Sequence, residues 1–181
     1  MSVATQTSPD QGHPHGHAHT PAPGRSHDHK ACVGDALSRA HGLCEARGAR
    51  LTTLRERVLE LVWSSHKPRG AYAILEEMAV DGKRVAPLTV YRALDFLVEQ
   101  GLVHRIESLN AYVGCPEPGQ SHSGQFLVCE RCGDATELND PAVSHAITAG
   151  AAAQGFRAQR QTVEVLGLCA ACQKAEGASA A

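Results

Sequence analysis

Hydrophobic positions in the first half of the chain recur every three or four residues, which is the spacing of amphipathic helices. Thr52 or Thr53 precedes the second such segment as an N-cap, and with Thr53 as the cap, Glu56 three residues later would complete a capping box. Pro87 and Gly101 bracket the fourth segment, as a first-turn proline and a C-cap glycine do. We therefore predict four helices, at residues 35–47, 53–63, 71–81 and 87–100.

Residues 102–115 have the alternating pattern of a β-hairpin, with its turn at Leu109-Asn110. A two-residue loop would place His104 directly opposite Cys115, and directly opposed side chains point to the same face of a hairpin. The two helices before the hairpin are joined by a short connection, and the second begins with small and polar residues, as in a helix-turn-helix. A helix-turn-helix followed by a hairpin is a winged helix, so residues 35–115 are predicted to form a winged-helix DNA-binding domain.

The second half begins with a link rich in proline and glycine, which we interpret as a hinge at residues 116–122. After it the pattern predicts a strand, a C-x2-C turn, a second strand, a helix from Asp140 to about Gln154, a third strand and another C-x2-C. In this helix Val143 and Ile147 are expected to point into the core. Residues 123–172 would be a small α/β unit, which makes the whole chain α+β. A unit of this size is too small to be stable without a metal ion or a partner subunit.

The two ends lack the apolar content of a folded core. Residues 1–31 are polar, hold six of the 11 histidines, and are predicted to be a disordered leader. Neutral imidazoles bind zinc or nickel, so the leader would either capture metal loosely or be a tail without a role. Residues 173–181 are predicted to be a second tail.

Composition narrows the possible environments of the protein. The N-terminus has no apolar segment of a secretory signal, and no apolar run approaches a membrane span, so we expect a cytoplasmic protein without a membrane partner. In a reducing cytoplasm, C-x2-C cysteines bind metal or do redox chemistry. The formal net charge is −2, but residues 50–105 carry nine Lys/Arg against seven Asp/Glu, a slight excess of positive charge in the segment predicted to bind DNA.

Four cysteines form a C-x2-C…C-x2-C set in which 36 residues separate the two pairs: Cys129, Cys132, Cys169 and Cys172. Four thiolates suit tetrahedral Zn²⁺ and leave no open coordination position, which is typical of a structural zinc site. The alternatives are a redox dithiol or four buried cysteines. Cys44, three residues after His41, is interpreted as a small buried residue and His41 as a surface residue.

A second metal site is suggested by His104, Cys115, His122 and Glu137. A thiolate and a carboxylate neutralise a divalent cation, and the nitrogen and sulfur donors favour zinc over manganese or magnesium. Four protein ligands leave no position for a substrate, which favours sensing over catalysis. These ligands come from the hairpin, the hinge and the second unit, so a bound ion would set the angle between the domains. The alternative is that these are ordinary surface groups.

Candidate DNA contacts lie on the two helices of the helix-turn-helix. Arg92 is placed to reach a base edge or a phosphate, while Thr89, Tyr91 and Tyr72 are candidate phosphate contacts. The alternative is that both tyrosines are half-buried core residues and that Arg92 is a solvated charge.

Six segments in this order together resemble the ferric uptake regulator (Fur) superfamily, and its zinc uptake regulator (Zur) branch most closely: LTTLRERVLE, AYAIL, TVYRALDFLVEQGLVHRIES, NAYVGC, FLVCERCG and GLCAAC. The resemblance covers roughly residues 36–172. It implies a dimeric repressor, not an enzyme, that binds AT-rich palindromic operators when loaded with zinc and shuts down zinc uptake. No small-molecule substrate is implied.

The resemblance also implies roles for individual residues. The four cysteines match the structural zinc ligands, and His104, Cys115, His122 and Glu137 match the sensing ligands, which gives two Zn²⁺ per subunit. Tyr72 and Arg92 match the DNA-contacting pair. The iron and manganese branches usually carry a His-rich run before the first C-x2-C, where this chain has Ser121-His122-Ser123. Alternatives are a family sensor of iron, manganese, nickel or peroxide on the same fold, and a zinc enzyme.

Overall fold

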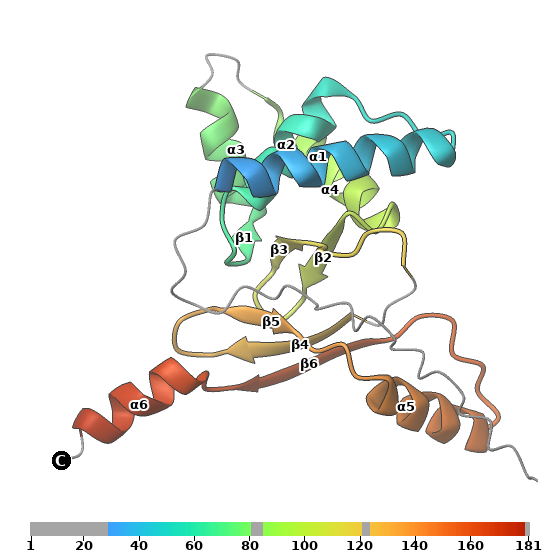
Figure 1. Ribbon diagram of the computed structural model, residues 1–181, viewed down its shortest axis with the longest axis vertical. Coiled ribbons are helices and arrows are strands. Elements are labelled where there is room, and N and C mark those ends of the chain that lie inside the picture. The colour runs from blue at the N-terminus through green and yellow to red at the C-terminus, as the bar shows by residue number, and fades with distance from the viewer. Residues whose placement is uncertain (1–28, 81–84, 121–123, 180–181) are drawn as a thin grey trace, which may run out of the picture.

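The helices predicted for the first half form one layer of the computed structural model, which describes residues 29–80, 85–120 and 124–179 (Figure 1). A small sheet lies beneath this layer and a second sheet lies beneath the first, with a helix projecting from each end of the second sheet. The helices are α1 (His29–Ala46), α2 (Thr53–Trp63), α3 (Ala71–Val80), α4 (Pro87–Glu99), α5 (Pro141–Ala153) and α6 (Ala170–Ser179). The strands are β1 (Arg69–Gly70), β2 (Val103–Ile106), β3 (Ala111–Gly114), β4 (Gly124–Cys129), β5 (Ala135–Glu137) and β6 (Thr162–Gly167).

The α+β fold class is confirmed, and the ends of α2 and α4 follow the predicted signals. The Thr52 side chain caps α2 by accepting from the N–H of Arg55, so Thr52 rather than Thr53 is the N-cap. Pro87 opens α4, and Gly101 follows its end with φ +66°, a backbone angle that glycine adopts without strain.

Two helices extend into the segments predicted to be a leader and a tail. Helix α1 begins at His29, not at residue 35, so the end of the predicted leader is helical; residues 1–28 lie outside the described residues. No proline interrupts residues 29–34, and Ala36, one turn further on, is already buried, so the helix extends toward the N-terminus. At the other end, α6 continues from the second cysteine pair through residue 179, so the described part of the predicted tail is helical.

The first sheet has the order β1-β3-β2 and contains the predicted hairpin, but in a different register. His104 pairs with Val113 rather than with Cys115, because the turn takes the four residues 107–110 instead of two. Asn110, at φ +46°, closes this turn by donating its N–H to the Glu107 carbonyl. A slip of two residues keeps every side chain on its predicted face. Strand β1 was not predicted, because a two-residue strand carries no periodicity.

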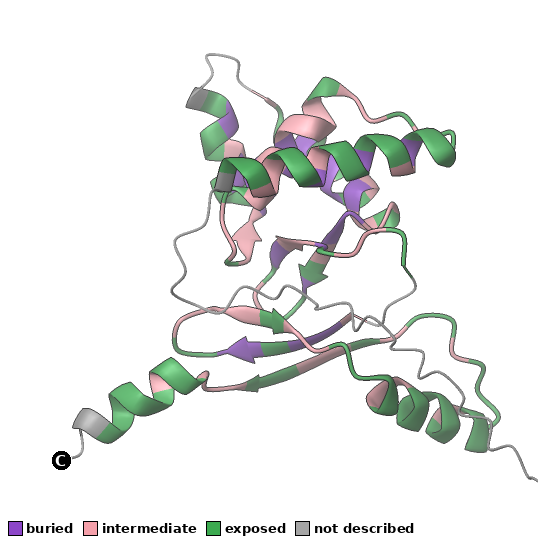
Figure 2. Cartoon of the chain, viewed as in Figure 1, coloured by how far each residue is buried: buried purple, intermediate pink, exposed green. Residues whose placement is uncertain are grey.

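The hairpin β2–β3 contributes one face to each of two cores. Val103 and Tyr112 belong to the main core beneath α1–α4, where most buried residues lie (Figure 2). On the opposite face Ile106 packs with Phe126 and Val128 of β4, and we call these three buried residues the bridging cluster. The hairpin therefore joins the helical domain to the second sheet through apolar contacts.

The second sheet has the order β5-β4-β6, with β4 and β6 parallel. Asp140 caps the intervening α5 by accepting from the N–H of Ala142 at 2.8 Å. Val143 and Ile147 were predicted to point into the core, but α5 buries none of its residues, and Ile147 is 37% exposed. This expectation is therefore wrong for the single chain, because the apolar side of α5 lacks a covering element among the described residues.

We expect Gly114→Ala to destabilise the protein. A Cβ at residue 114 would lie 2.7 Å from Cζ2 of Trp63 and closer still to Cε2, so the indole ring would have to move. Such overpacking costs about 1–3 kcal/mol of unfolding free energy. Urea unfolding at fixed protein concentration measures this change.

Gly42→Ala is the matched control. Gly42 is exposed within α1, and a Cβ added there would meet no atom within 4 Å, so alanine should stabilise the helix by about 0.5–1 kcal/mol. Equal stability of Gly114→Ala and the parent protein would show that the Trp63 ring does not occupy this position.

Candidate metal centres and nucleic-acid interface

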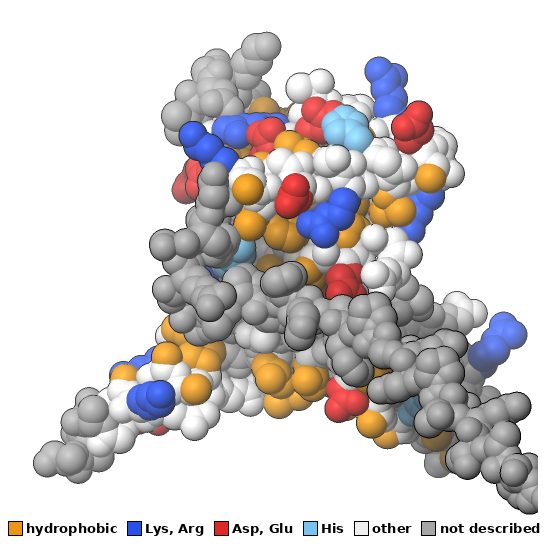
Figure 3. Space-filling view, in the orientation of Figure 1, with side chains coloured by type: hydrophobic (Ala, Val, Ile, Leu, Met, Phe, Trp, Pro, Cys, Tyr) orange, Lys and Arg blue, Asp and Glu red, His pale blue; other side chains and the backbone are white. Residues whose placement is uncertain are grey.

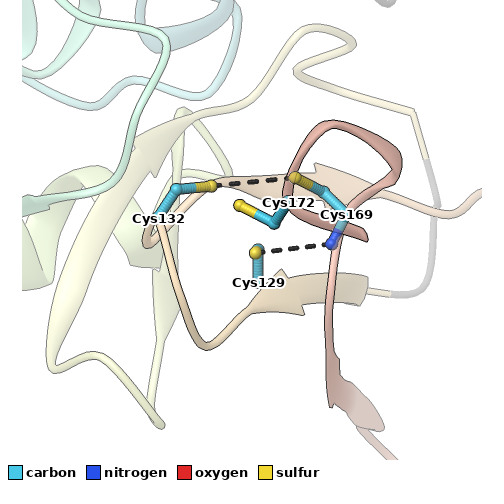
Figure 4. A group of neighbouring side chains, drawn as sticks. All are labelled: Cys129, Cys132, Cys169 and Cys172. Atoms are coloured by element: carbon cyan, nitrogen blue, oxygen red, sulfur yellow. Dashed lines mark hydrogen bonds between the residues drawn. The ribbon is translucent and has the colours of Figure 1, made fainter. Parts of the chain in front are cut away.

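The four cysteines of the two C-x2-C pairs lie together at one end of the second sheet (Figure 4). Their sulfur atoms all lie within 4.8 Å of one another, and no other group of three or more His, Cys, Asp or Glu is brought together in this way within the described ranges. The parallel register produces this arrangement, because Cys129 at the end of β4 pairs with Gly167 at the end of β6. Gly133, at φ +69°, allows the tight turn after the first pair.

The spacing of the sulfurs fits a tetrahedral zinc site. Sγ of Cys132 and Sγ of Cys169 are 3.8 Å apart. A tetrahedron with Zn–S bonds of about 2.3 Å has sulfur–sulfur edges of about 3.8 Å. A four-cysteine site of the zinc type is therefore evident.

The electrostatics of this cluster also favour a cation. The Cys169 N–H donates to Sγ of Cys129 at 3.4 Å, and backbone hydrogen bonds from residues 169 and 132 lower the pKa of Cys129 to about 6. Burial, followed by hydrogen bonds with the neighbouring sulfurs, raises the pKa of Cys172 to about 12. In the absence of a cation, a thiolate at one cysteine therefore disfavours deprotonation of the neighbouring cysteines. A divalent ion would stabilise all four thiolates.

Three of the four residues predicted for the second metal site are described, and His122 lies outside the described residues. Nε2 of His104 on β2 is 3.7 Å from Oε1 of Glu137 on β5, and both side chains are more than four-fifths buried. Cys115 follows β3, and its N–H donates to the Leu102 carbonyl at 3.0 Å. The hairpin and β5 thus bring an imidazole and a carboxylate together across the two domains.

Apolar groups restrict the position of the His104 ring. Its centroid is 5.2 Å from that of Phe126, with the rings tilted by 59°. The imidazole is therefore packed and oriented rather than free in solvent.

Cys115 is buried, and burial raises the pKa of its thiol to about 12, with the nearby Glu137 carboxylate adding to the effect. The thiol is therefore protonated at neutral pH in the metal-free protein. Metal ligation by Cys115 would require loss of this proton, so binding would become tighter as pH rises.

The predicted DNA contacts occupy different environments. Tyr72 on α3 is 69% exposed, and Thr89 and Arg92 near the start of α4 are also exposed. Tyr91 is half-buried against the main core, which favours the alternative that it anchors α4. Leu88 at the start of α4 is 59% exposed and was not among the predicted contacts, because an apolar residue next to a proline carries no DNA-binding signal.

Three residues outside the predicted sites lie in environments that the structure defines. Cys44 is 1% exposed within the main core, as predicted for a small buried residue. His41 is on the surface, but its Nε2 is 3.2 Å from Oε1 of Glu56. Sequence patterns also missed Glu164 of β6, which accepts hydrogen bonds from the turn of the hairpin.

None of the helices in the described part of the chain combines the length and the apolar character needed to cross a membrane.

Comparison with known proteins gives matches over most of the chain. The model of the ferric uptake regulator family matches residues 46–166. The zinc uptake regulation protein of Escherichia coli (strain K12) is 38% identical over 148 residues, which cover 81% of this chain and 86% of that protein. The protein of the same description from Mycobacterium tuberculosis (strain CDC 1551 / Oshkosh) is 30% identical over 131 residues, covering 71% and 98%.

Two solved structures agree with these matches. A zinc uptake regulator complexed with zinc and DNA has a TM-score of 0.76 at 38% identity, covering 80% of this chain and 97% of that chain. The crystal structure of holo XcZur has a TM-score of 0.71 at 45% identity, covering 77% and 98%.

We expect Cys172→Ser to remove one zinc ion per chain and to destabilise the second sheet, because three thiolates and a hydroxyl hold zinc much less tightly than four thiolates. Zinc content by atomic emission and the thermal melting curve measure both effects. Cys32→Ser, on α1 and away from the cluster, is the control and should keep the parent zinc content. A full complement of zinc in Cys172→Ser would contradict the four-cysteine site.

Proposed function

Because the chain belongs to the ferric uptake regulator family, we propose that it is a zinc-responsive transcriptional repressor of zinc uptake genes. It would act in the cytoplasm as a homodimer on AT-rich palindromic operators. The observation that carries this proposal is the similarity, at a TM-score of 0.76, to a zinc uptake regulator complexed with zinc and DNA over 80% of the chain. Membership of this family makes the protein a regulator and not an enzyme.

The exposed start of α4 is the surface that would enter the major groove. The second helix of a helix-turn-helix contacts base edges with its N-terminal residues. Arg92 would donate to a base edge or a phosphate, and Thr89 and Tyr72 would contact the backbone. Tyr91, half-buried against the main core, would hold α4 in place.

His104, Cys115, His122 and Glu137 would hold the regulatory ion, and the four-cysteine cluster would hold the structural one. Of the first set, His104 on the hairpin lies 3.7 Å from Glu137 on β5. Zinc bound there would link the domains by coordination bonds, which in zinc peptides contribute on the order of 10 kcal/mol. A shift from 1:99 to 99:1 between two domain arrangements needs about 5.5 kcal/mol, so one ion suffices.

Homodimer formation is supported by apolar surface on the second sheet and its helix. Strand β6 is an edge strand of the described sheet, and edge strands readily pair with another chain. Leu127, Val165 and Leu166 are between 43% and 52% exposed, and helix α5 buries no residue. Hydrophobic side chains are exposed over this lower part of the molecule, toward α5 and α6 (Figure 3). A second copy of the chain would bury this surface and set the spacing of the two α4 helices.

We expect operator binding to require zinc and to weaken when a regulatory ligand is removed. Fluorescence anisotropy of a labelled AT-rich palindrome, titrated at buffered free zinc, measures the response. His104→Ala and Cys115→Ser should bind the operator at least about tenfold more weakly at a free zinc level that saturates the parent, since each removes a ligand that links the domains.

His41→Ala is the control, because this surface histidine lies outside both metal sets. Full zinc-dependent binding by both ligand variants would refute the regulatory assignment. The same titration with iron and manganese tests the other sensors of this family.

We expect Arg92→Ala to weaken operator binding by about 1–3 kcal/mol, because that is the usual contribution of an arginine contact to a base. Arg160→Ala is the matched control: Arg160 is exposed outside the helical domain and should leave operator affinity unchanged. Anisotropy at several salt concentrations distinguishes a phosphate contact, whose loss lowers the salt dependence, from a base contact. Unchanged affinity of Arg92→Ala would place Arg92 outside the DNA interface.

A further inference from the structure

A carboxylate of the second sheet binds the backbone of the hairpin turn. Glu164 of β6 accepts the N–H of Glu107 at 2.6 Å and the N–H of Ser108 at 2.9 Å. One acceptor oxygen serves each donor, so the interaction uses both oxygens of the carboxylate. These residues are 57 and 56 positions apart in the chain, and the contact joins the two domains directly.

The register of the sheet puts Glu164 in this position. Glu164 pairs with Phe126, and paired residues of neighbouring strands point to the same face. Phe126 belongs to the bridging cluster, together with Ile106 at the end of β2, and the hairpin turn begins at the next residue. Glu164 therefore lies on the face of the sheet that packs against the hairpin, and its side chain reaches the turn.

The charge state of Glu164 suits this role. Burial alone would raise the pKa of its carboxyl, but hydrogen bonds from the Ser108 side chain and from the two backbone N–H groups outweigh that effect and leave the pKa below its ordinary value. The group is thus a carboxylate at neutral pH. Hydrogen bonds from N–H groups to a carboxylate are roughly twice as strong as those between neutral partners.

The Glu107 side chain does not compete for this interaction. The Glu107 side chain is 62% exposed, and its carboxylate forms an ion pair with Arg105, whose Nε is 3.1 Å away. Glu164 thus contacts the turn through two backbone N–H groups and the Ser108 side chain, and not through the Glu107 carboxylate.

We propose that Glu164 is a positioning residue that holds the hairpin turn on the second sheet and thereby sets the zinc concentration at which the regulator responds. This inference rests on the proposed function. His104 lies on the same hairpin and Glu137 on the same sheet, so a movement of the whole hairpin away from the second sheet would break the Glu164 contact and separate these two ligands together. Only the docked arrangement would bind the regulatory ion tightly, and apparent affinity falls in proportion to the docked fraction.

The test compares Glu164→Gln with the parent protein. Glutamine has the same shape, but its NH2 group would face one of the two N–H donors, so one hydrogen bond and the charge are lost together. We expect about tenfold more free zinc to be needed for half-maximal operator binding, the factor given by losing a hydrogen bond to a charged group. Hydrogen exchange of the Glu107 and Ser108 amides should speed up in the metal-free protein.

The controls separate this effect from general destabilisation. Glu176→Gln removes an exposed carboxylate from α6 and should leave the zinc response and the amide exchange unchanged. Zinc content of the four-cysteine site and the melting curve report whether each variant is folded. Glu164→Asp keeps the charge but shortens the side chain, so it should shift the response in the same direction and replaces Glu164→Gln if that variant does not fold.

Three different results would contradict the inference, the contact or the proposed function. A parental zinc midpoint in folded Glu164→Gln would overturn the inference while leaving the proposed function intact. Unchanged exchange at both turn amides would overturn the contact itself. Absence of zinc-dependent operator binding in the parent protein would overturn the proposed function, and the present inference with it.

Discussion

The parallel pairing of β4 with β6 is the constraint on which the C-terminal half depends. One register places Cys129 beside Gly167, so that the two C-x2-C turns meet, and places Glu164 beside Phe126, facing the hairpin. A slip by one residue would turn Glu164 to the other face and separate the cysteine pairs. The four-cysteine site in turn ties together the ends of both strands, so the metal site and the register would stabilise each other.

The hairpin β2–β3 connects the second sheet to the helical domain by packing against both. Its strands are buried on both faces: Val103 and Tyr112 pack beneath the helices, and Ile106 packs on the second sheet. Two of the candidate regulatory ligands, His104 and Glu137, lie 3.7 Å apart at this junction and belong to neither core cluster.

The helical part and the second sheet differ in how many buried residues each contributes to a core of its own. Within the ranges that the structure describes, the main core contains 16 buried residues, whereas the bridging cluster contains three, and α5 adds none. The second unit would therefore depend on interactions beyond its own side chains: the hairpin on one face of the sheet, a cysteine-bound ion at one end and a second copy of the chain on the exposed apolar surface. Such dependence would make this unit responsive to metal and to association.

Local patterns in the sequence were sufficient for the helices α2–α5, the hairpin, the strands β4–β6 and the four-cysteine cluster, because periodicity, caps and the C-x2-C spacing act over a few residues. Only the tertiary structure decided that His104 pairs with Val113, that Tyr91 packs on the main core and that Glu164 binds the hairpin turn. Turn length, burial and contacts between residues more than 50 positions apart depend on how the elements pack, and no short stretch of sequence contains that information.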